Sequence, residues 1–146
     1  MYSDSRSGSR GARTQVIVID ASAVLELLFQ TPSGLQVAAR VAPTGESLHA
    51  PHLLDLEVIQ VVRRYERLGV VDEARARQAL EDLAALDIAR YPHDVMWQRV
   101  WELRRNLTAY DGAYVALAEA LRAPLLTSDT RIAGAAGHRA RVEVIR

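Results

Sequence analysis

The stretch VIVIDASAVLELL, which runs from Val16 to Leu28, constrains the fold of this chain more than any other. A run of β-branched apolar residues is typical of a strand that is covered on both faces, as in parallel sheets. A helical pattern starts directly after Asp20, at the end of this strand. A carboxylate at the end of a buried strand is costly unless it is paired. The rest of the chain must therefore supply a partner for Asp20, or further carboxylates and a metal.

Strands and helices alternate along the remaining sequence. We expect strands at Val16–Ile19, Ser47–Ala50, Asp87–Tyr91, Leu125–Thr127 and Val142–Ile145. We expect helices at Ser22–Leu28, Leu35–Val41, Leu53–Leu68, Asp72–Leu86, His93–Asn106 and Ala109–Arg122, with a short helical turn near Asp129. This alternation predicts a three-layer α/β/α domain with a mostly parallel central sheet. Sites in such sheets lie beyond the carboxyl ends of the strands.

The chain divides into a tail and one domain. Residues 1–14 are rich in Ser, Gly and Arg, and we expect them to be disordered. Residues 15–146 suffice for one domain with its own core, and no linker or repeat divides them. No apolar run resembles a signal peptide or a membrane span. The sequence has no Cys, which excludes disulfides and thiolate metal sites and fits the cytoplasm.

The charge balance limits how this chain can contact nucleic acid. Its formal net charge is zero, and all 18 basic residues are Arg. Steering of nucleic acid by the whole molecule is therefore weak, so any contact with RNA or DNA must use local patches. The stretch from Arg131 to Arg146 contains four Arg and one Glu and is one candidate. A solvated basic end is an equally good interpretation of that stretch.

Four acidic residues lie at the ends of predicted elements. Asp20 and Asp129 each follow a strand at its carboxyl end, so they face one crevice if those strands are neighbours. Thr108 and Asp111 form a Thr-x-x-Asp capping pair, which places Asp111 in a first helical turn. Glu57 lies near the start of the long helix after Pro51. The apolar residues of that helix predict that much of its surface is buried and that Glu57 points inward; they are Leu53, Leu56, Val61 and Leu68.

Each acid also has a structural interpretation. Asp20 could form an Asx-turn, Asp111 and Asp129 could be capping residues, and Glu57 could pair with an Arg. Together, carboxylates in one crevice repel each other unless a cation neutralises them. Oxygen ligands without Cys fit Mg²⁺ or Mn²⁺ rather than zinc. Such a site suits the activation of water for attack on a phosphodiester.

These four acids, in their order and local settings, resemble the acidic quartet of PIN-domain nucleases. The resemblance rests on VIDASAVLELL around Asp20, on Glu57, on LTAYDGAYVALAEAL around Asp111 and on LLTSDTRIA around Asp129. It extends over residues 16–145 and is strongest to VapC-type toxins, the ribonuclease half of toxin–antitoxin pairs. The region around Asp111 and the LLTSD segment are its most specific parts. One departure is Gln60, where the family often has Asn.

The resemblance implies a metal-dependent endoribonuclease. Asp20, Asp111 and Asp129 would bind Mg²⁺ or Mn²⁺ directly or through water, and Glu57 would be a ligand or would orient a water. Ser22 and Thr127 lie beside these acids and could donate hydrogen bonds to them, although turn and cap roles explain them equally well. The implied partners are an RNA substrate, a VapB-type antitoxin that blocks the site, and a second copy of the chain in a homodimer.

Three alternatives remain open. A haloacid dehalogenase-like phosphatase also has an Asp after its first strand, but it usually needs a second Asp two residues later, where this chain has Ser22, and a Lys, which this chain lacks. A PIN nuclease of RNA processing would share the quartet. The third alternative is a non-catalytic binding or scaffold module in which the acids have degenerated, and the presence of all four acids argues against it.

Other residues carry weaker signals. The four His residues, His49, His52, His93 and His138, lack the spacing of a metal site. Trp97 and Trp101 are four residues apart on one helix face, which favours packing in the core or in a dimer over base stacking.

Overall fold

The computed structural model describes residues 15–43 and 45–146, and within these ranges the chain forms one five-stranded sheet. The tail predicted for residues 1–14 lies outside the described residues. The strands are β1 (Gln15–Ile19), β2 (Glu46–Pro51), β3 (Ile88–Tyr91), β4 (Leu125–Thr127) and β5 (Val142–Val144). Their order is β3-β2-β1-β4-β5, and every neighbouring pair is parallel. The predicted parallel sheet is confirmed, and β1 lies at its centre.

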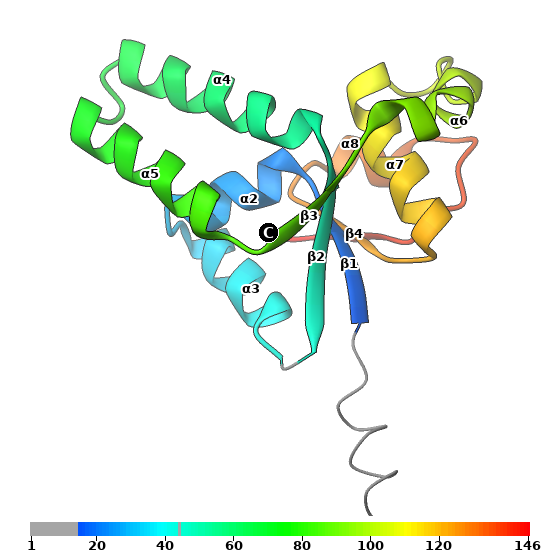
Figure 1. The fold of residues 1–146 in the computed structure, drawn as a ribbon, viewed down its shortest axis with the longest axis horizontal. Helices are drawn as coiled ribbons and strands as arrows, with labels where there is room; N and C mark the ends of the chain where they lie inside the picture. Colours follow the sequence, from blue (N-terminus) through cyan, green and yellow to red (C-terminus); the bar gives the residue numbers. More distant parts are fainter. Residues whose placement is uncertain (1–14, 44) are drawn as a thin grey trace, which may run out of the picture.

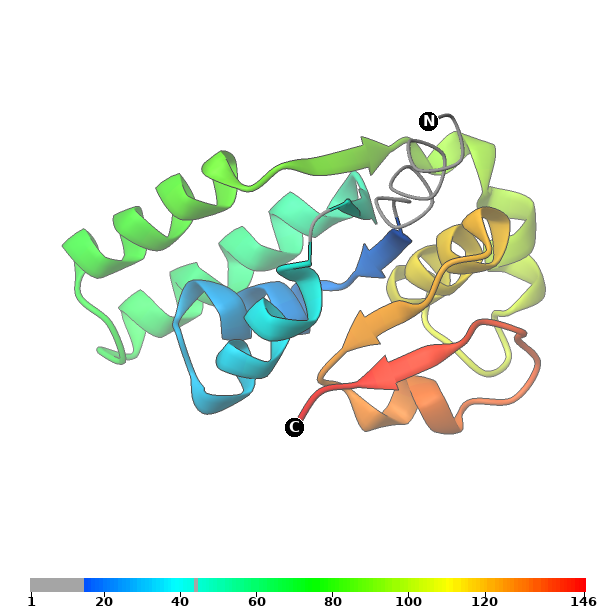
Figure 2. The same ribbon diagram turned by 90° about the horizontal axis from the view of Figure 1, so that it is seen from below.

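Helices cover both faces of the sheet, which confirms the three-layer α/β/α fold (Figure 1). One layer contains α2 (Ala21–Leu28), α3 (Pro32–Val41), α4 (Leu53–Arg67) and α5 (Glu73–Ala85). The other contains α6 (Trp97–Glu102) and α7 (Ala109–Leu121), and the short α8 (Thr130–Gly134) precedes β5. Helices α4 and α5 lie side by side as a long hairpin that projects away from α6 and α7 (Figure 2). Among the described helices, none is long and apolar enough to cross a membrane.

The core is built around β1 and α7. Ile17, Val18 and Ile19 of β1 are fully buried because helices lie on both sides of the strand. In α7, every residue from Gly112 to Ala118 is buried, and its small side chains let the helix lie close to β1 and β2. Each large apolar side chain buried in this way contributes about 1.5–3 kcal/mol to folding. The two elements that carry Asp20 and Asp111 are therefore among the most firmly packed parts of the fold.

Side-chain caps fix where the helices near the crevice begin. Asp20, Thr108 and Asp129 each accept a hydrogen bond from a backbone N–H in the first turn of the helix that follows. Asp72 caps α5 in the same way, as predicted. Thr31 caps α3, so this helix begins at Pro32, three residues before the predicted start.

One expectation about a helix was wrong, and another was wrong only for the core: packing of Trp97 and Trp101 in a dimer stays a prediction. The segment predicted as one helix over His93–Asn106 is divided into a 3₁₀ turn, η1 (His93–Val95), and α6, because Met96 leaves helical geometry with φ of −134° and buries its side chain. Trp97 and Trp101 are 60% and 61% exposed, so they do not pack in the core of this chain.

The buried face of α4 also differs from the prediction. Leu56 and Leu68 are mainly exposed, whereas Leu54, Val58 and Val62 are buried. The spacing of four residues places these three side chains on one stripe of the helix. Residues beside this stripe are partly buried, and the opposite side of α4 is open to solvent.

Candidate active site

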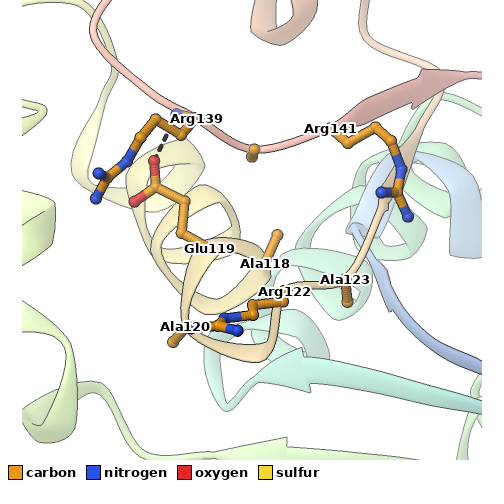
Figure 3. Close-up of a pocket in the computed structure, with 8 residues that line it drawn as sticks. Ala118, Glu119, Ala120, Arg122, Ala123, Arg139 and Arg141 are labelled. Atoms are coloured by element: carbon orange, nitrogen blue, oxygen red, sulfur yellow. Dashed lines mark hydrogen bonds between the residues drawn. The ribbon is translucent and has the colours of Figure 1, made fainter.

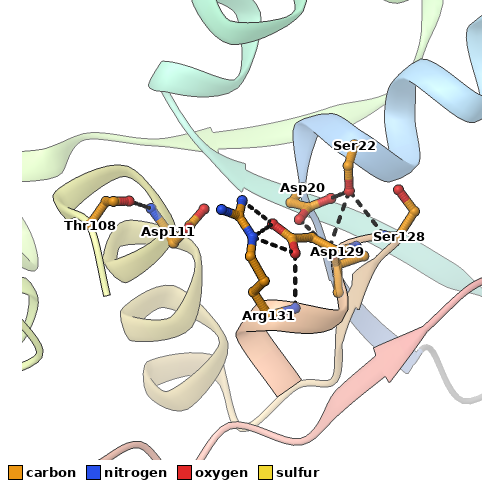
Figure 4. A network of polar contacts seen from close by, with 8 residues as sticks. Asp20, Ser22, Thr108, Asp111, Ser128, Asp129 and Arg131 are labelled. Atoms are coloured by element: carbon orange, nitrogen blue, oxygen red, sulfur yellow. Dashed lines mark hydrogen bonds and ion pairs between the residues drawn. The ribbon is translucent and has the colours of Figure 1, made fainter. Parts of the chain in front are cut away.

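The first two acids come from the two strands at the centre of the sheet. Strands β1 and β4 are parallel neighbours, with Ile19 opposite Leu126. Asp20 and Asp129 follow these strands, so both lie at the carboxyl edge of the sheet (Figure 4). The condition that the sequence left open, that the two strands be adjacent, is confirmed.

Asp20 is a buried carboxylate whose hydrogen-bond partners are all neutral. Its side chain is only 5% exposed. Oδ1 accepts hydrogen bonds from Ser22 Oγ (2.6 Å) and the backbone N of Ala23 (3.1 Å), and Oδ2 accepts one from Thr127 Oγ1 (2.5 Å). Burial raises the pKa of Asp20, against these hydrogen bonds, which lower it, and the negative charge of Asp111 raises it further. The contacts orient the carboxylate without neutralising its charge.

The hydroxyls of Ser22 and Thr127 serve the site and the loop together. Both contact Asp20, as the sequence suggested. Ser22 Oγ also accepts a hydrogen bond from the backbone N of Ser128, and Thr127 Oγ1 accepts one from the backbone N of Asp129. The turn after β4 is therefore tied to the start of α2, which fixes Asp129 relative to Asp20.

Glu57 reaches the site from α4 and is held by Tyr114 of α7. The Tyr114 hydroxyl donates a hydrogen bond of 2.6 Å to Glu57 Oε1. Burial raises the pKa of Glu57, the hydrogen bond lowers it, and the charges of Asp111 and Asp20 raise it further. Glu57 is half-buried and turned toward the other acids, as predicted, and it pairs with a tyrosine rather than with an Arg.

Asp111 lies in the first turn of α7, where Thr108 Oγ1 accepts a hydrogen bond from its backbone N (3.1 Å). This is the capping pair predicted from the sequence. Burial raises the pKa of the Asp111 carboxyl, and the charge of Asp129 raises it further. Asp111 thus perturbs or is perturbed by the three other acids, which places all four within one electrostatic neighbourhood.

Asp129 is already paired with a cation of this chain. Arg131 binds its carboxylate through Nη2 (2.7 Å) and Nε (3.1 and 3.3 Å), and this pairing lowers the pKa of Asp129. The Arg131 guanidinium lies between Asp129 and Asp111 (Figure 4), and its charge also lowers the pKa of Asp111. Asp129 also caps α8, as its structural interpretation required.

The donor set fits a hard divalent cation. Each candidate ligand is a carboxylate oxygen, and the pKa of Asp20, Glu57 and Asp111 is raised because burial and mutual repulsion disfavour their charged forms. In the part of the chain that the structure describes, no three His, Asp or Glu side chains lie close enough together to hold a metal ion. Mg²⁺ does not need three protein ligands, because it keeps several waters and binds through one or two carboxylates.

Two residues of the site were not identified from the sequence. Tyr114 was given no role at the site, although its position three residues after Asp111 places both on one face. Arg131 was noted only as part of the basic C-terminal stretch, although it follows Asp129 by two residues. Gln60, the departure from the family pattern, is exposed, and its side chain forms no hydrogen bond with a described residue.

The histidines have structural roles. His49 contacts Ser47 and Tyr91, His93 accepts a hydrogen bond from the backbone of Leu53, and His138 contacts the carbonyl of Ile132.

Comparisons with known proteins show the family to which the chain belongs. The PIN domain family model matches residues 17–137. Ribonuclease VapC12 of Mycobacterium tuberculosis is 40% identical over 130 residues, which cover 89% of this chain and 99% of that protein. VapC ribonuclease Mb0985 of Mycobacterium bovis is 44% identical over 120 residues, which cover 80% and 88% of the two chains. In fold, the chain is similar to VapBC2 from Rickettsia felis bound to a DNA fragment from their promoter (TM-score 0.67, 12% identity, 90% and 100% covered). The chain therefore belongs to the PIN domain family, and its relatives within that family include the VapC ribonucleases.

Proposed function

We propose that this protein is a metal-dependent endoribonuclease and the toxin of a type II toxin–antitoxin pair. The observation that carries the proposal is Asp20, a buried carboxylate that is oriented by three neutral donors and lies near Glu57 and Asp111, whose pKa values are also raised. A protein that needed Asp20 only as a helix cap would have no reason to add Glu57 and Asp111 beside it. The ribonuclease names of relatives that are 40% and 44% identical support RNA as the substrate.

The residues of this chain have distinct roles in the proposed reaction. Asp20, Asp111, Asp129 and Glu57 would hold Mg²⁺ or Mn²⁺. The bound cation would lower the pKa of a water and stabilise negative charge on the phosphate and the leaving oxygen. Ser22 and Thr127 keep the Asp20 carboxylate in one orientation, and Tyr114 does the same for Glu57.

The proposed partners follow from the relatives and from one surface. Three solved structures of similar fold, from Rickettsia felis, Haemophilus influenzae and Mycobacterium tuberculosis, are named as VapBC pairs, which supports a VapB-type antitoxin as partner. We also propose a homodimer, in which the exposed Trp97 and Trp101 would lose contact with water. RNA, antitoxin and toxin would meet in the cytoplasm.

The test is cleavage of total cellular RNA by the wild type and by Asp20→Asn, with Mn²⁺, with Mg²⁺ and with EDTA. We expect cleavage only by the wild type and only with metal. Asp87→Asn is the matched control, because Asp87 is an exposed acid before β3, at the opposite edge of the sheet. It should cut like the wild type. Normal cleavage by Asp20→Asn would refute the site assignment.

Two further measurements separate the alternatives. Hydrolysis of p-nitrophenyl phosphate without RNA cleavage would favour a phosphatase. Growth arrest on expression, relieved by the protein encoded next to this one, would distinguish a toxin from a nuclease of RNA processing.

A further inference from the structure

A basic hollow, separate from the acidic crevice, lies at the opposite edge of the sheet. It has a volume of about 590 Å³ and is formed where α7 ends and where the chain approaches β5 (Figure 3). Arg122 lies on one side, and Arg139 and Arg141 lie on the other, with alanine side chains between them. Two of these arginines belong to the C-terminal basic stretch that the sequence marked as a candidate nucleic-acid patch.

The positive charge of this hollow is only partly offset by nearby acids: the charge of Arg139 lowers the pKa of Glu119, and that of Arg141 lowers the pKa of Glu143. Glu119 is the one acid that lines it, and Arg99 of α6 already binds both oxygens of its carboxylate (2.7 and 3.0 Å). The backbone N of Arg139 donates a third hydrogen bond to it (2.7 Å). The side chains of Arg122, Arg139 and Arg141 are exposed and form no hydrogen bond or ion pair with any residue in 15–43 or 45–146.

Stabilisation of the helix end does not account for three arginines. The C-terminus of an α-helix carries about half a negative charge, and one cation in the last turn suffices to offset it. Arg122 also takes a left-handed backbone conformation with φ of 53°, where Gly is usual because it has no Cβ. An arginine at this position therefore stands against local backbone preference, which indicates a role for its side chain.

We propose that this hollow, the Arg122 patch (Arg122, Arg139 and Arg141), binds the phosphate backbone of RNA as an anchor separate from the acidic crevice. The guanidinium groups are spread around the rim rather than directed at one point, which fits the spaced phosphates of a chain better than a single anion (Figure 3). The planar fork of Arg binds phosphate oxygens as well as carboxylates, so the spacing of the three guanidinium groups, and not their chemistry alone, favours RNA.

The inference rests on the proposed ribonuclease function and explains how it could work. The four acids repel RNA phosphates, and a net charge of zero supplies no general attraction. An anchor elsewhere on the surface would offset this repulsion. Asp129 at the crevice follows Ala123 at the patch by six positions in the sequence, so the Cα atoms of these two residues are at most about 20 Å apart. A folded RNA such as a hairpin can span this distance, whereas a dinucleotide cannot.

The test measures binding rather than cleavage. Unfractionated transfer RNA is titrated in EDTA, between 50 and 200 mM salt, into the wild type and into Arg122→Gln/Arg139→Gln/Arg141→Gln. We expect weaker binding by the variant and a slope of log K against log salt that is smaller by about 2, because each lost phosphate contact removes about 0.7. The matched control removes three exposed arginines from α4, as Arg63→Gln/Arg64→Gln/Arg67→Gln.

Each outcome decides the proposal. The proposal is supported if only the patch variant loses RNA affinity and salt-dependence slope while it binds a polyglutamate peptide as the wild type does. An equal loss in the α4 control, or no loss in the patch variant, overturns it. Loss of polyglutamate binding without loss of RNA binding overturns it in favour of an acidic peptide. Cleavage of the RNA with Mn²⁺ by the wild type is measured in parallel. If the patch variant binds RNA normally and the wild type still cleaves RNA, only the anchor is refuted and the proposed ribonuclease function stands.

Discussion

Tyr114 and Glu57 are 57 residues apart in the sequence and are joined by a hydrogen bond of 2.6 Å. Tyr114 lies on α7, which covers one face of the sheet, and Glu57 lies on α4, which belongs to the other layer. The contact therefore connects the two helical layers above the carboxyl edge of the sheet. It also fixes a carboxylate that would otherwise be free to turn into solvent.

We predict that Tyr114→Phe weakens both the fold and the reaction. A hydrogen bond to a charged group contributes about 1.5–3 kcal/mol, so the free energy of unfolding should fall by about this amount. The same bond lowers the pKa of Glu57, so its loss should raise that pKa. We expect the acidic limb of the pH profile for RNA cleavage to move to higher pH.

Tyr110→Phe is the matched control, because Tyr110 lies on the same helix and is 64% exposed. Chemical denaturation and cleavage rates between pH 5 and 8 measure both effects. An unchanged pH profile in Tyr114→Phe would show that the hydroxyl does not act on Glu57.

The strands and the acids could be predicted because their signals are local. The run from Val16 to Ile19 is covered on both faces, and its apolar composition reports this directly. Asp20 and Asp129 follow strands, and Thr108 precedes Asp111 by three residues, so short sequence patterns place them at element ends. The family resemblance supplied the remaining step, that these ends meet in one crevice.

Features that depend on distant contacts could not be predicted. The pairing of Tyr114 with Glu57 requires the relative placement of two helices, and no local pattern encodes it. Trp97 and Trp101 have the spacing of a packed face but are exposed, because no apolar element of the described part of the chain covers them, and the Trp101 ring is stacked by Arg104. Arg131 pairs with Asp129 because α8 begins at Thr130, between the two residues, and the Arg131 side chain points toward the Asp129 carboxylate.

The stability of the metal-free protein should depend on pH through Asp20. Burial raises the folded-state pKa of Asp20 above its value in the unfolded chain. Below the folded-state pKa, the carboxyl is protonated in the folded protein and its burial costs little. As the pH rises through the folded-state pKa, a buried group must ionise and stability is lost. We predict that Asp20→Asn is more stable than the wild type in EDTA, by a margin that grows from pH 4 to pH 7.

Thermal unfolding in EDTA measures this margin. A tenfold difference between the acid dissociation constants of the folded and unfolded states corresponds to about 1.4 kcal/mol, and each kcal/mol to about 2–4 °C in Tm for a protein of this size. Asp87→Asn serves as the control, because it removes an exposed charge outside the crevice. A margin that is constant with pH, or that shrinks as the pH rises, would contradict the assignment of Asp20 as a buried, uncompensated carboxylate.

Arg131 and a divalent cation compete for the same carboxylate. The guanidinium contacts both oxygens of Asp129 and places a positive charge beside Asp111. We predict that Arg131→Gln binds Mn²⁺ more tightly, by at least about five-fold at low salt, because even two unit charges about 4 Å apart in water repel by about 1 kcal/mol and Mn²⁺ carries two charges. The gain should shrink as salt is added. Stability should change little, because the Arg131 side chain is 83% exposed and its ion pair is screened by solvent.

Isothermal titration with Mn²⁺ in the absence of RNA measures this effect without relying on cleavage. Arg77→Gln is the control, because Arg77 is 80% exposed and pairs with Glu81 on α5, away from the crevice. It should bind Mn²⁺ like the wild type. Weaker or unchanged Mn²⁺ binding by Arg131→Gln would mean that the cation does not use the Asp129 oxygens that Arg131 holds, and Asp129 would then be only the cap of α8.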